Sequence, residues 1–194
     1  SSVLSPSEVL ARLDSLLRGN AIVCGGAGMH VVYANDYLLS RGPGQFLAAV
    51  NFGAMGFGMA AAMSAKLVDP GREVVDVLGD GEFLMTVQDL ETVVREKIAV
   101  RLVVINDSSY RVLEAKQKLQ YQGHVIGTRH GNPDFLTLAQ AFGLKGVRLS
   151  ARSQIDEALR EMLESPGPVL LEVVCDPDDF PPTNLEAVLK MGQG

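Results

Sequence analysis

The chain has 194 residues, 47% of them hydrophobic and 21% charged, which is ordinary for one globular domain and excludes a disordered chain. Its net charge of −6 argues against a nucleic-acid-binding surface, which would need a basic stripe. The first ten residues carry neither the basic nor the apolar region of a signal peptide. Two cysteines, Cys24 and Cys175, are too few for a disulfide scaffold, so we expect inert core thiols in a cytoplasmic protein.

Short apolar runs alternate with helical patterns along the whole chain. A capping box, Ser5-Pro6-Ser7-Glu8, begins the first expected helix, and Gly19 ends it. We expect strands at residues 21–24, 73–78, 101–105, 147–149 and 169–174, and a further strand end near residue 46. The helices expected between them lie near His30 and over residues 55–67, 86–97, 112–119, 132–142 (capped by Asn132) and 153–164 (capped by Ser153).

One stretch, residues 46–65, contains no charged residue and is long enough to suggest a membrane span. Much of it is glycine and alanine, however, and alanine gains little from lipid. We therefore interpret the stretch as a strand end, a glycine-rich turn and a fully buried helix over residues 55–67.

The near-continuous apolar strands are typical of a sheet covered on both faces. We predict one α/β domain over residues 1–194, built on an open parallel sheet of about six strands with helices on both faces. An extended tail follows over residues 176–194. Ligands of such sheets bind beyond the carboxyl ends of the strands. Glycine and small polar residues gather at three of these ends, at residues 25–30, 79–82 and 106–110.

Two acidic elements follow two successive apolar strands. Gly79-Asp80-Gly81 comes after one strand, and Asn106-Asp107 comes 24 residues later, after one helical crossover. If these strands are neighbours, both carboxylates point into one crevice, and two hard oxygen ligands suit Mg²⁺ with a phosphate group. The alternative is that the first element is only a turn and the second only a cap. Their pairing favours a magnesium–diphosphate site.

A nicotinamide-binding fingerprint is a weaker interpretation. Gly26-Ala27-Gly28 follows an apolar strand, but Val31 stands where the third glycine of the fingerprint belongs. No Walker-A lysine pattern occurs in the chain either.

The same residues carry a family resemblance over almost the whole chain. Gly79-Asp80-Gly81, the spacer and Asn106-Asp107 resemble the thiamine-diphosphate (ThDP) signature, Gly-Asp-Gly followed by Asn-Asn. The chain looks like the C-terminal, diphosphate-binding domain of the acetolactate-synthase-like decarboxylases and carboligases, which have the ThDP-binding fold. Three further segments are similar to this family: Gly28-Met29-His30, residues 51–58, and residues 131–135 with 141–143.

The resemblance implies a role for each matching position. Asp80 and Asp107 would ligate Mg²⁺ through their side chains, and Ser109 through its carbonyl. Gly53 would accept a hydrogen bond from the aminopyrimidine, and Met55 would hold the cofactor in its bent V conformation. The remaining cofactor-binding positions would be Gly28, His30, Gly79, Gly81, Glu82 and Tyr110, with the amides of Gly81 and Glu82 and the ring of His30 holding the diphosphate.

Some positions depart from the family pattern. Asp107 stands where the family mostly has Asn, which adds negative charge beside a diphosphate, and Met29 replaces a polar phosphate contact. Arg111 and Lys116 replace a small residue and a tryptophan near the substrate. These two cations would suit an anionic substrate tail, or they point to solvent. We expect His124 and His130 to be surface or interface residues.

The family needs a glutamate from a separate pyrimidine-binding domain, which a chain of this length has no room to hold. The resemblance therefore implies one subunit of a split 2-oxo acid decarboxylase or carboligase, in which a pyrimidine-domain partner completes the active site, as an α2β2 assembly. The uncharged stretch would be partly interfacial. The alternatives are an excised domain of a longer synthase and a non-catalytic ThDP-binding module.

Overall fold

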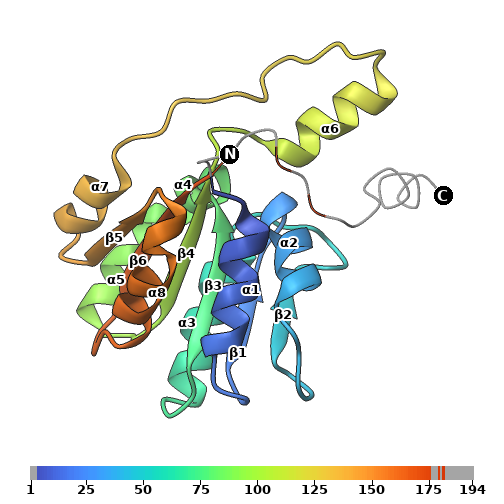
Figure 1. The fold of residues 1–194 in the computed structure, drawn as a ribbon. Coiled ribbons are helices and arrows are strands. Elements are labelled where there is room, and N and C mark those ends of the chain that lie inside the picture. Colours follow the sequence, from blue (N-terminus) through green and yellow to red (C-terminus); the bar gives the residue numbers. More distant parts are fainter. Residues whose placement is uncertain (1–3, 176–178, 180, 182–194) are drawn as a thin grey trace.

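The computed structural model describes residues 4–175, 179 and 181, and it contains one parallel sheet of six strands (Figure 1). The strand order is β2-β1-β3-β4-β6-β5. The expectation of an open parallel α/β sheet is confirmed. Apart from residues 179 and 181, the expected C-terminal tail lies outside the described residues. The strands are β1 (Ile22–Gly25), β2 (Phe46–Ala48), β3 (Val74–Gly79), β4 (Arg101–Asn106), β5 (Lys145–Leu149) and β6 (Val169–Val174).

The strand register brings the carboxyl ends of the central strands to one edge. β1 and β3 are neighbours, and Gly25 pairs with Val77. β3 and β4 are neighbours in turn, and Gly79 pairs with Ile105. Both neighbouring pairs are parallel, so the connections that leave β1, β3 and β4 emerge side by side.

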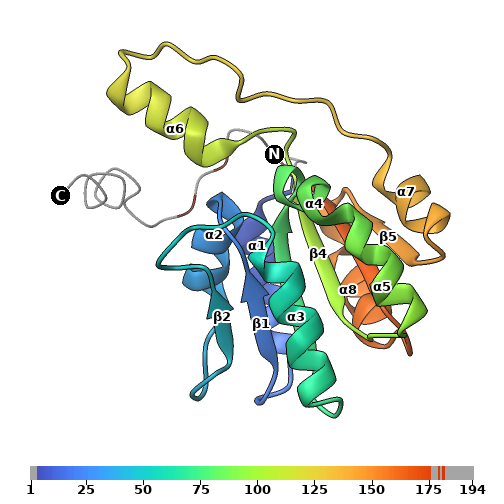
Figure 2. The same cartoon turned by 180° about the vertical axis from the view of Figure 1, so that it is seen from behind.

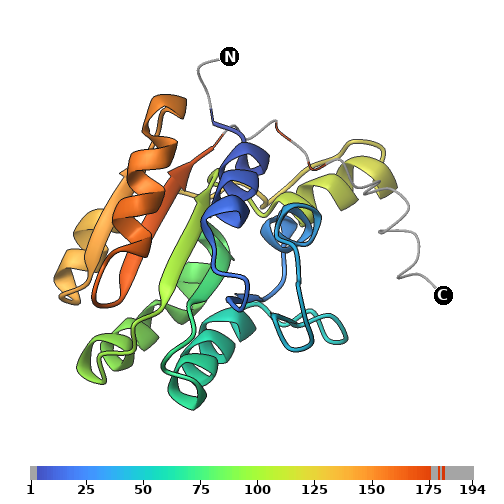
Figure 3. The ribbon, with the colours of Figure 1, turned by 60° about the horizontal axis from the view of Figure 1, so that its bottom comes forward.

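Helices cover both faces of the sheet, which explains why the strands are mostly apolar (Figure 3). One face packs against α1 (Pro6–Leu16), α2 (Met29–Tyr37) and α8 (Ile155–Leu163). The other packs against α3 (Phe57–Val68), α4 (Asp80–Thr86), α5 (Leu90–Arg95) and α7 (Phe135–Ala141). Only α6 (Arg111–Gln120) stands beyond the carboxyl edge, away from the two layers (Figure 2).

The structure corrects two expectations about helices. The helix expected at residues 86–97 begins earlier, at Asp80, and breaks into a short 3₁₀ turn (Val87–Asp89) before α5. The helix expected to be fully buried, α3, buries only Gly58, Met59 and Ala62, while Leu67 and Val68 are exposed. α3 rests on the sheet along one face only. Because small apolar side chains occur all around this helix, the sequence does not distinguish its buried face from its exposed one.

Two expected helix caps are wrong. α7 begins at Phe135, and Asp134 caps it by accepting a hydrogen bond from the Thr137 amide at 2.7 Å, so Asn132 lies outside the helix. Ser153 lies within a 3₁₀ turn (Arg152–Gln154) that precedes α8. At the start of the chain, Ser5 caps α1 as expected.

The two cysteines are free and buried, as expected. Within residues 4–175, 179 and 181, no helix has the length and apolarity that crossing a membrane requires.

Candidate functional site

Four loops at the carboxyl edge of the sheet surround a cavity of about 240 Å³. They follow β1, β2, β3 and β4, so segments far apart in the sequence meet at one place (Figure 1). Every site residue expected from the sequence lines this cavity: Gly28, His30, Gly53, Met55, Gly79, Asp80, Gly81, Glu82, Asp107, Ser109 and Tyr110.

Asp80 is buried at the first position of α4, and its carboxylate accepts hydrogen bonds from three segments. Oδ1 accepts from the Gly81 amide at 2.7 Å, and Oδ2 accepts from the Ser108 amide at 2.6 Å. The side-chain amide of Asn132 donates to the same Oδ2 at 2.8 Å. These donors fix the carboxylate in one orientation.

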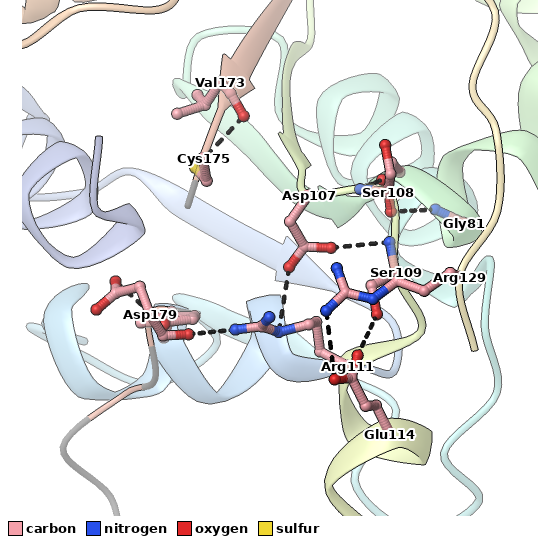
Figure 4. A network of polar contacts seen from close by, with 12 residues as sticks. Gly81, Asp107, Ser108, Ser109, Arg111, Glu114, Arg129, Val173, Cys175 and Asp179 are labelled. Carbon is pink, nitrogen blue, oxygen red and sulfur yellow. Dashed lines mark hydrogen bonds and ion pairs between the residues drawn. The ribbon is translucent and has the colours of Figure 1, made fainter. Parts of the chain in front are cut away.

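Asp107 follows the neighbouring strand β4. Its Oδ1 accepts a hydrogen bond from the Ser109 amide at 3.0 Å, and its Oδ2 lies 3.4 Å from Nε of Arg111 (Figure 4). Burial, followed by the nearby charge of Asp80, raises the pKa of Asp107 to about 7. The charge of Asp80 therefore opposes the ionisation of Asp107, which is expected where a divalent cation would lie between two carboxylates.

The donor set suits a cation that completes its coordination with ligand oxygens. Among the described residues, no group of three or more His, Cys, Asp and Glu side chains is arranged to hold a metal ion. Mg²⁺ is usually bound through one or two carboxylates, several waters and the phosphates of a ligand. Two carboxylates beside a cavity fit Mg²⁺ with a phosphate ligand better than they fit a structural metal.

Close packing explains several of the glycines. A Cβ on Gly81 would lie 2.4 Å from the ring of Tyr110, and a Cβ on Gly28 would lie 2.6 Å from the ring of His30. In the loop before α3, Gly53 and Gly56 have φ values of 61° and 90°, which other residues rarely adopt. The clustered glycines thus let backbone and rings approach the cavity closely.

The structure also shows a buried histidine–carboxylate contact that the sequence did not suggest. Nε2 of His30 lies 2.5 Å from Oε2 of Glu82, and both side chains are buried. Oε1 of Glu82 accepts a hydrogen bond from the Gly56 amide at 2.6 Å. The carboxylate of Glu82 therefore links the loops after β1, β2 and β3.

Asn132 and His130 are site residues that sequence reasoning missed. His130 lies 3.6 Å from Asp80 through Nε2 and packs its ring 4.8 Å from that of Tyr110, so it is not a surface residue; an interface role stays a prediction. Asn132 bonds Asn106 as well as Asp80. They lie beyond α6 in the sequence. The chain returns beside the loop that follows β4, where the His130 amide donates to the Ser108 carbonyl, and this return brings them to the site. His124 is exposed, as expected.

The two additional cations have different surroundings. Arg111 is buried and lines the cavity, and its Nη2 donates to the carbonyl of Asp179 at 2.5 Å. Lys116 is exposed on α6, one turn beyond the cavity-lining Val112 and Leu113. Of the two, only Arg111 is part of the cavity wall.

Comparison with known families identifies this arrangement. The family model described as "Thiamine pyrophosphate enzyme, C-terminal TPP binding domain" matches residues 26–173. The match includes all four loops of the cavity.

Similar curated proteins are much longer than this chain. Acetolactate synthase 1, chloroplastic, of Oryza sativa subsp. japonica is 35% identical over 179 residues, covering 88% of this chain and 28% of that protein. The enzyme of the same name from Zea mays shows the same identity and coverage. The acetolactate synthase catalytic subunit, mitochondrial, of Saccharomyces cerevisiae is 33% identical over 178 residues, covering 90% of this chain and 26% of that protein. The chain thus spans little more than a quarter of each relative.

Proposed function

Because this chain belongs to the thiamine pyrophosphate enzymes, as their C-terminal TPP-binding domain, we propose that it is the diphosphate- and Mg²⁺-binding subunit of a split ThDP-dependent 2-oxo acid decarboxylase or carboligase. The observation that carries this proposal is the single cavity at the carboxyl edge. The two loops of the ThDP signature line it, and so do the two loops that carry the family-like segments at residues 28–30 and 51–58, although all four are separated along the chain.

In this proposal, Asp80 and Asp107 ligate Mg²⁺ through their side chains, and Ser109 ligates it through its carbonyl. The support is that the two carboxylates lie on neighbouring loops and that the Ser109 amide already orients Asp107. Magnesium would offset the repulsion between the carboxylates and hold the diphosphate. The amides of Gly81 and Glu82 would contact the diphosphate, with His30 placed beside it by Glu82.

Gly53 and Met55 would position the cofactor ring. The Gly53 amide donates to the Ala49 carbonyl at 2.7 Å, which closes a tight turn and leaves both residues at the cavity wall. When bound, ThDP supplies the electron sink that decarboxylation of a 2-oxo acid requires. The chain's own contribution is to hold this cofactor, orient its rings and shield it from water.

A partner chain would provide the pyrimidine side and the catalytic glutamate, in an α2β2 assembly. Large apolar side chains beside the cavity are exposed in this chain: Phe52 is 97% exposed and Val50 is 83% exposed. Exposed apolar groups of this kind are typical of an interaction surface. A cytoplasmic location stays a prediction, because the curated relatives are named as chloroplastic or mitochondrial.

A second candidate is that the chain is one domain of a longer synthase. The coverage of only 26–28% of the curated relatives favours it, because those chains continue well beyond the matched part. The chemistry assigned to the cavity is the same in both cases.

The test is to mix the chain with a candidate pyrimidine-domain chain and to measure CO₂ release from 2-oxo acids with ThDP and Mg²⁺. We expect release only from the mixture, and its loss with Asp80→Ala but not with His124→Ala, a change in an exposed residue. Full turnover by this chain alone would contradict the split-subunit arrangement. If Asp80→Ala abolished ThDP binding but left the cellular function intact, the chain would be a non-catalytic binding module.

A further inference from the structure

We propose that Arg111 is a positioning residue that compensates the charge of Asp107, so that an aspartate can serve as a metal ligand beside a diphosphate. This inference rests on the proposed function, because it concerns the same cavity. It assigns Arg111 to the metal site, rather than to the tail of a substrate.

The geometry places the two residues as a local pair. Asp107 lies in the loop after β4, and Arg111 is the first residue of α6, four positions later. Nε of Arg111 lies 3.4 Å from Oδ2 of Asp107, and the side chains are only 4% and 13% exposed. Figure 4 shows the guanidinium between Asp107 and Asp179. Because the pair is shielded from water, its charges interact more strongly than those of a surface ion pair.

The charges around the cavity show why compensation is needed. Three carboxylates line it, those of Asp80, Glu82 and Asp107. His30 lies against Glu82, and among the described residues that line the cavity, Arg111 is the only lysine or arginine. A diphosphate adds further negative charge, so an unpaired Asp107 would repel it. An ion pair with Arg111 keeps the Asp107 oxygen available to a metal while removing that net charge.

A second contact holds Arg111 in place. Its Nη2 donates to the Asp179 carbonyl at 2.5 Å, and the Asp179 side chain accepts from the Ser5 hydroxyl at 2.6 Å and faces the Tyr33 hydroxyl at 3.3 Å. Arg111 therefore also links α6 to α1 and α2. A test must separate compensation of charge from this structural contact.

The experiment compares the full chain with Asp107→Asn, Arg111→Gln and the double variant. Mn²⁺ binding alone is followed by electron paramagnetic resonance, and ThDP binding at saturating Mn²⁺ by calorimetry. Arg111→Gln leaves the site more negative, so we expect tighter Mn²⁺ binding but about tenfold weaker ThDP binding. Asp107→Asn should weaken Mn²⁺ binding. The double variant restores the net charge, so its ThDP affinity should return to within about threefold of the wild type.

The matched control is Arg101→Gln. Arg101 is another buried arginine at the opposite end of β4, where it donates to the carbonyls of Leu163, Ser165 and Gly167. Its loss should lower the melting temperature without changing either affinity. If Arg111→Gln weakened Mn²⁺ and ThDP binding together, or if the double variant bound ThDP no better than Arg111→Gln, the role of Arg111 would be structural and the inference would be overturned.

Failure of the proposed function gives a different result. In that case the wild-type chain binds no ThDP, alone or with a pyrimidine-domain partner. The pairing of Asp107 with Arg111 is then still tested by thermal unfolding of the wild type, the two single variants and the double variant, all without metal. Paired charges predict that the change in melting temperature of the double variant is more favourable than the sum of the two single changes, whereas additive changes contradict the pairing.

Discussion

At the residue scale, Asn132 makes more hydrogen bonds than any other neutral side chain described in the site. Its amide nitrogen donates to Asp80, to Asn106 and, at 3.4 Å, to the hydroxyl of Ser108. The amide therefore ties the end of β4 and its loop to the start of α4. Removing it leaves a carboxylate oxygen of Asp80 with one hydrogen bond fewer in a buried position.

We predict that Asn132→Ala lowers the free energy of unfolding by about 1–3 kcal/mol, because buried polar groups lose their partner. Urea titration of the two proteins measures the change. His124→Ala is the matched control in the same segment, and it should stay within about 0.5 kcal/mol of the wild type because His124 is exposed. Equal stability of Asn132→Ala and wild type would show that the amide holds nothing together.

A pH dependence follows from the raised pKa of Asp107, which is about 7 in the folded chain. An unfolded aspartate titrates near pH 3.9. Between these values the folded chain holds a proton that the unfolded chain has released, so stability must fall as pH rises, by at most about 1.4 kcal/mol per pH unit.

The measurement is chemical unfolding of the metal-free chain between pH 4 and 8. The difference between Asp107→Asn and wild type should grow in favour of the variant across this range and level off above about pH 7. A constant difference would mean that the pKa of Asp107 is not raised. The raised pKa of Asp76 does not interfere, since Asp76 is present in both proteins.

The sequence predicted the residues next to the motifs but not their distant partners. Asp80 and Asp107 each follow an apolar strand, so the two side chains come close together if β3 and β4 pair. The arrival of Asn132 and His130 depends on where the chain returns after α6, which no local pattern encodes. The pairing of His30 with Glu82 was missed for a similar reason, because it spans the loops of two strands.

At the scale of elements, the N-terminus of α3 lies very close to the strand end and loop of β1. A Cβ on Gly58 would lie 2.4 Å from Oδ1 of Asp76, 3.0 Å from the Gly26 amide nitrogen and 3.1 Å from the Gly25 carbonyl carbon. Two of these atoms belong to the backbone and cannot rotate away. Gly58 therefore sets the distance between α3 and the loop that carries the β1 side of the cavity.

We predict that Gly58→Ala destabilises the chain by about 1–3 kcal/mol, because the added methyl forces α3 away from β1. Gly19→Ala is the control, since a Cβ there meets nothing within 4 Å, and it should be neutral or slightly stabilising. Thermal unfolding of both variants tests the difference. Similar melting temperatures for the two would show that α3 shifts without cost.

Elements with a strong hydrophobic pattern were predicted well, and elements without such a pattern were not. β3, β4 and β6 are predominantly apolar runs, and their expected bounds differ from the observed ones by a residue at most. The early start of α4 was missed because Gly79-Asp80-Gly81 is typical of a turn, and here Asp80 already adopts the helical conformation. The exposed end of α3 was missed because Leu67 and Val68 continue an apolar run without facing the sheet.

At the scale of the whole molecule, four strongly exposed apolar side chains lie at the two ends of the segment from residue 50 to residue 68. Val50 and Phe52 lie beside the cavity, whereas Leu67 and Val68 lie at the far end of α3. In the proposed assembly, the first pair would be covered by the partner chain that completes the active site. The second pair lies a whole helix away from the cavity.

We predict that Phe52→Asp abolishes association with the pyrimidine-domain chain and leaves the unfolding of the isolated chain unchanged, because Phe52 is 97% exposed. Val68→Asp is the matched control, an exposed apolar residue remote from the cavity. Light scattering of the mixtures measures association. Assembly that survives Phe52→Asp would place the partner on another face.

The position of β6 between β4 and β5 has a consequence for biosynthesis. One backbone edge of β4 pairs with β6, and β5 has no neighbour other than β6 in the described sheet. A nascent chain emerging from the ribosome therefore exposes an open strand edge until residues 169–174 are released, and such edges attract other chains. The interval before this last strand arrives is when a chaperone would have most to protect.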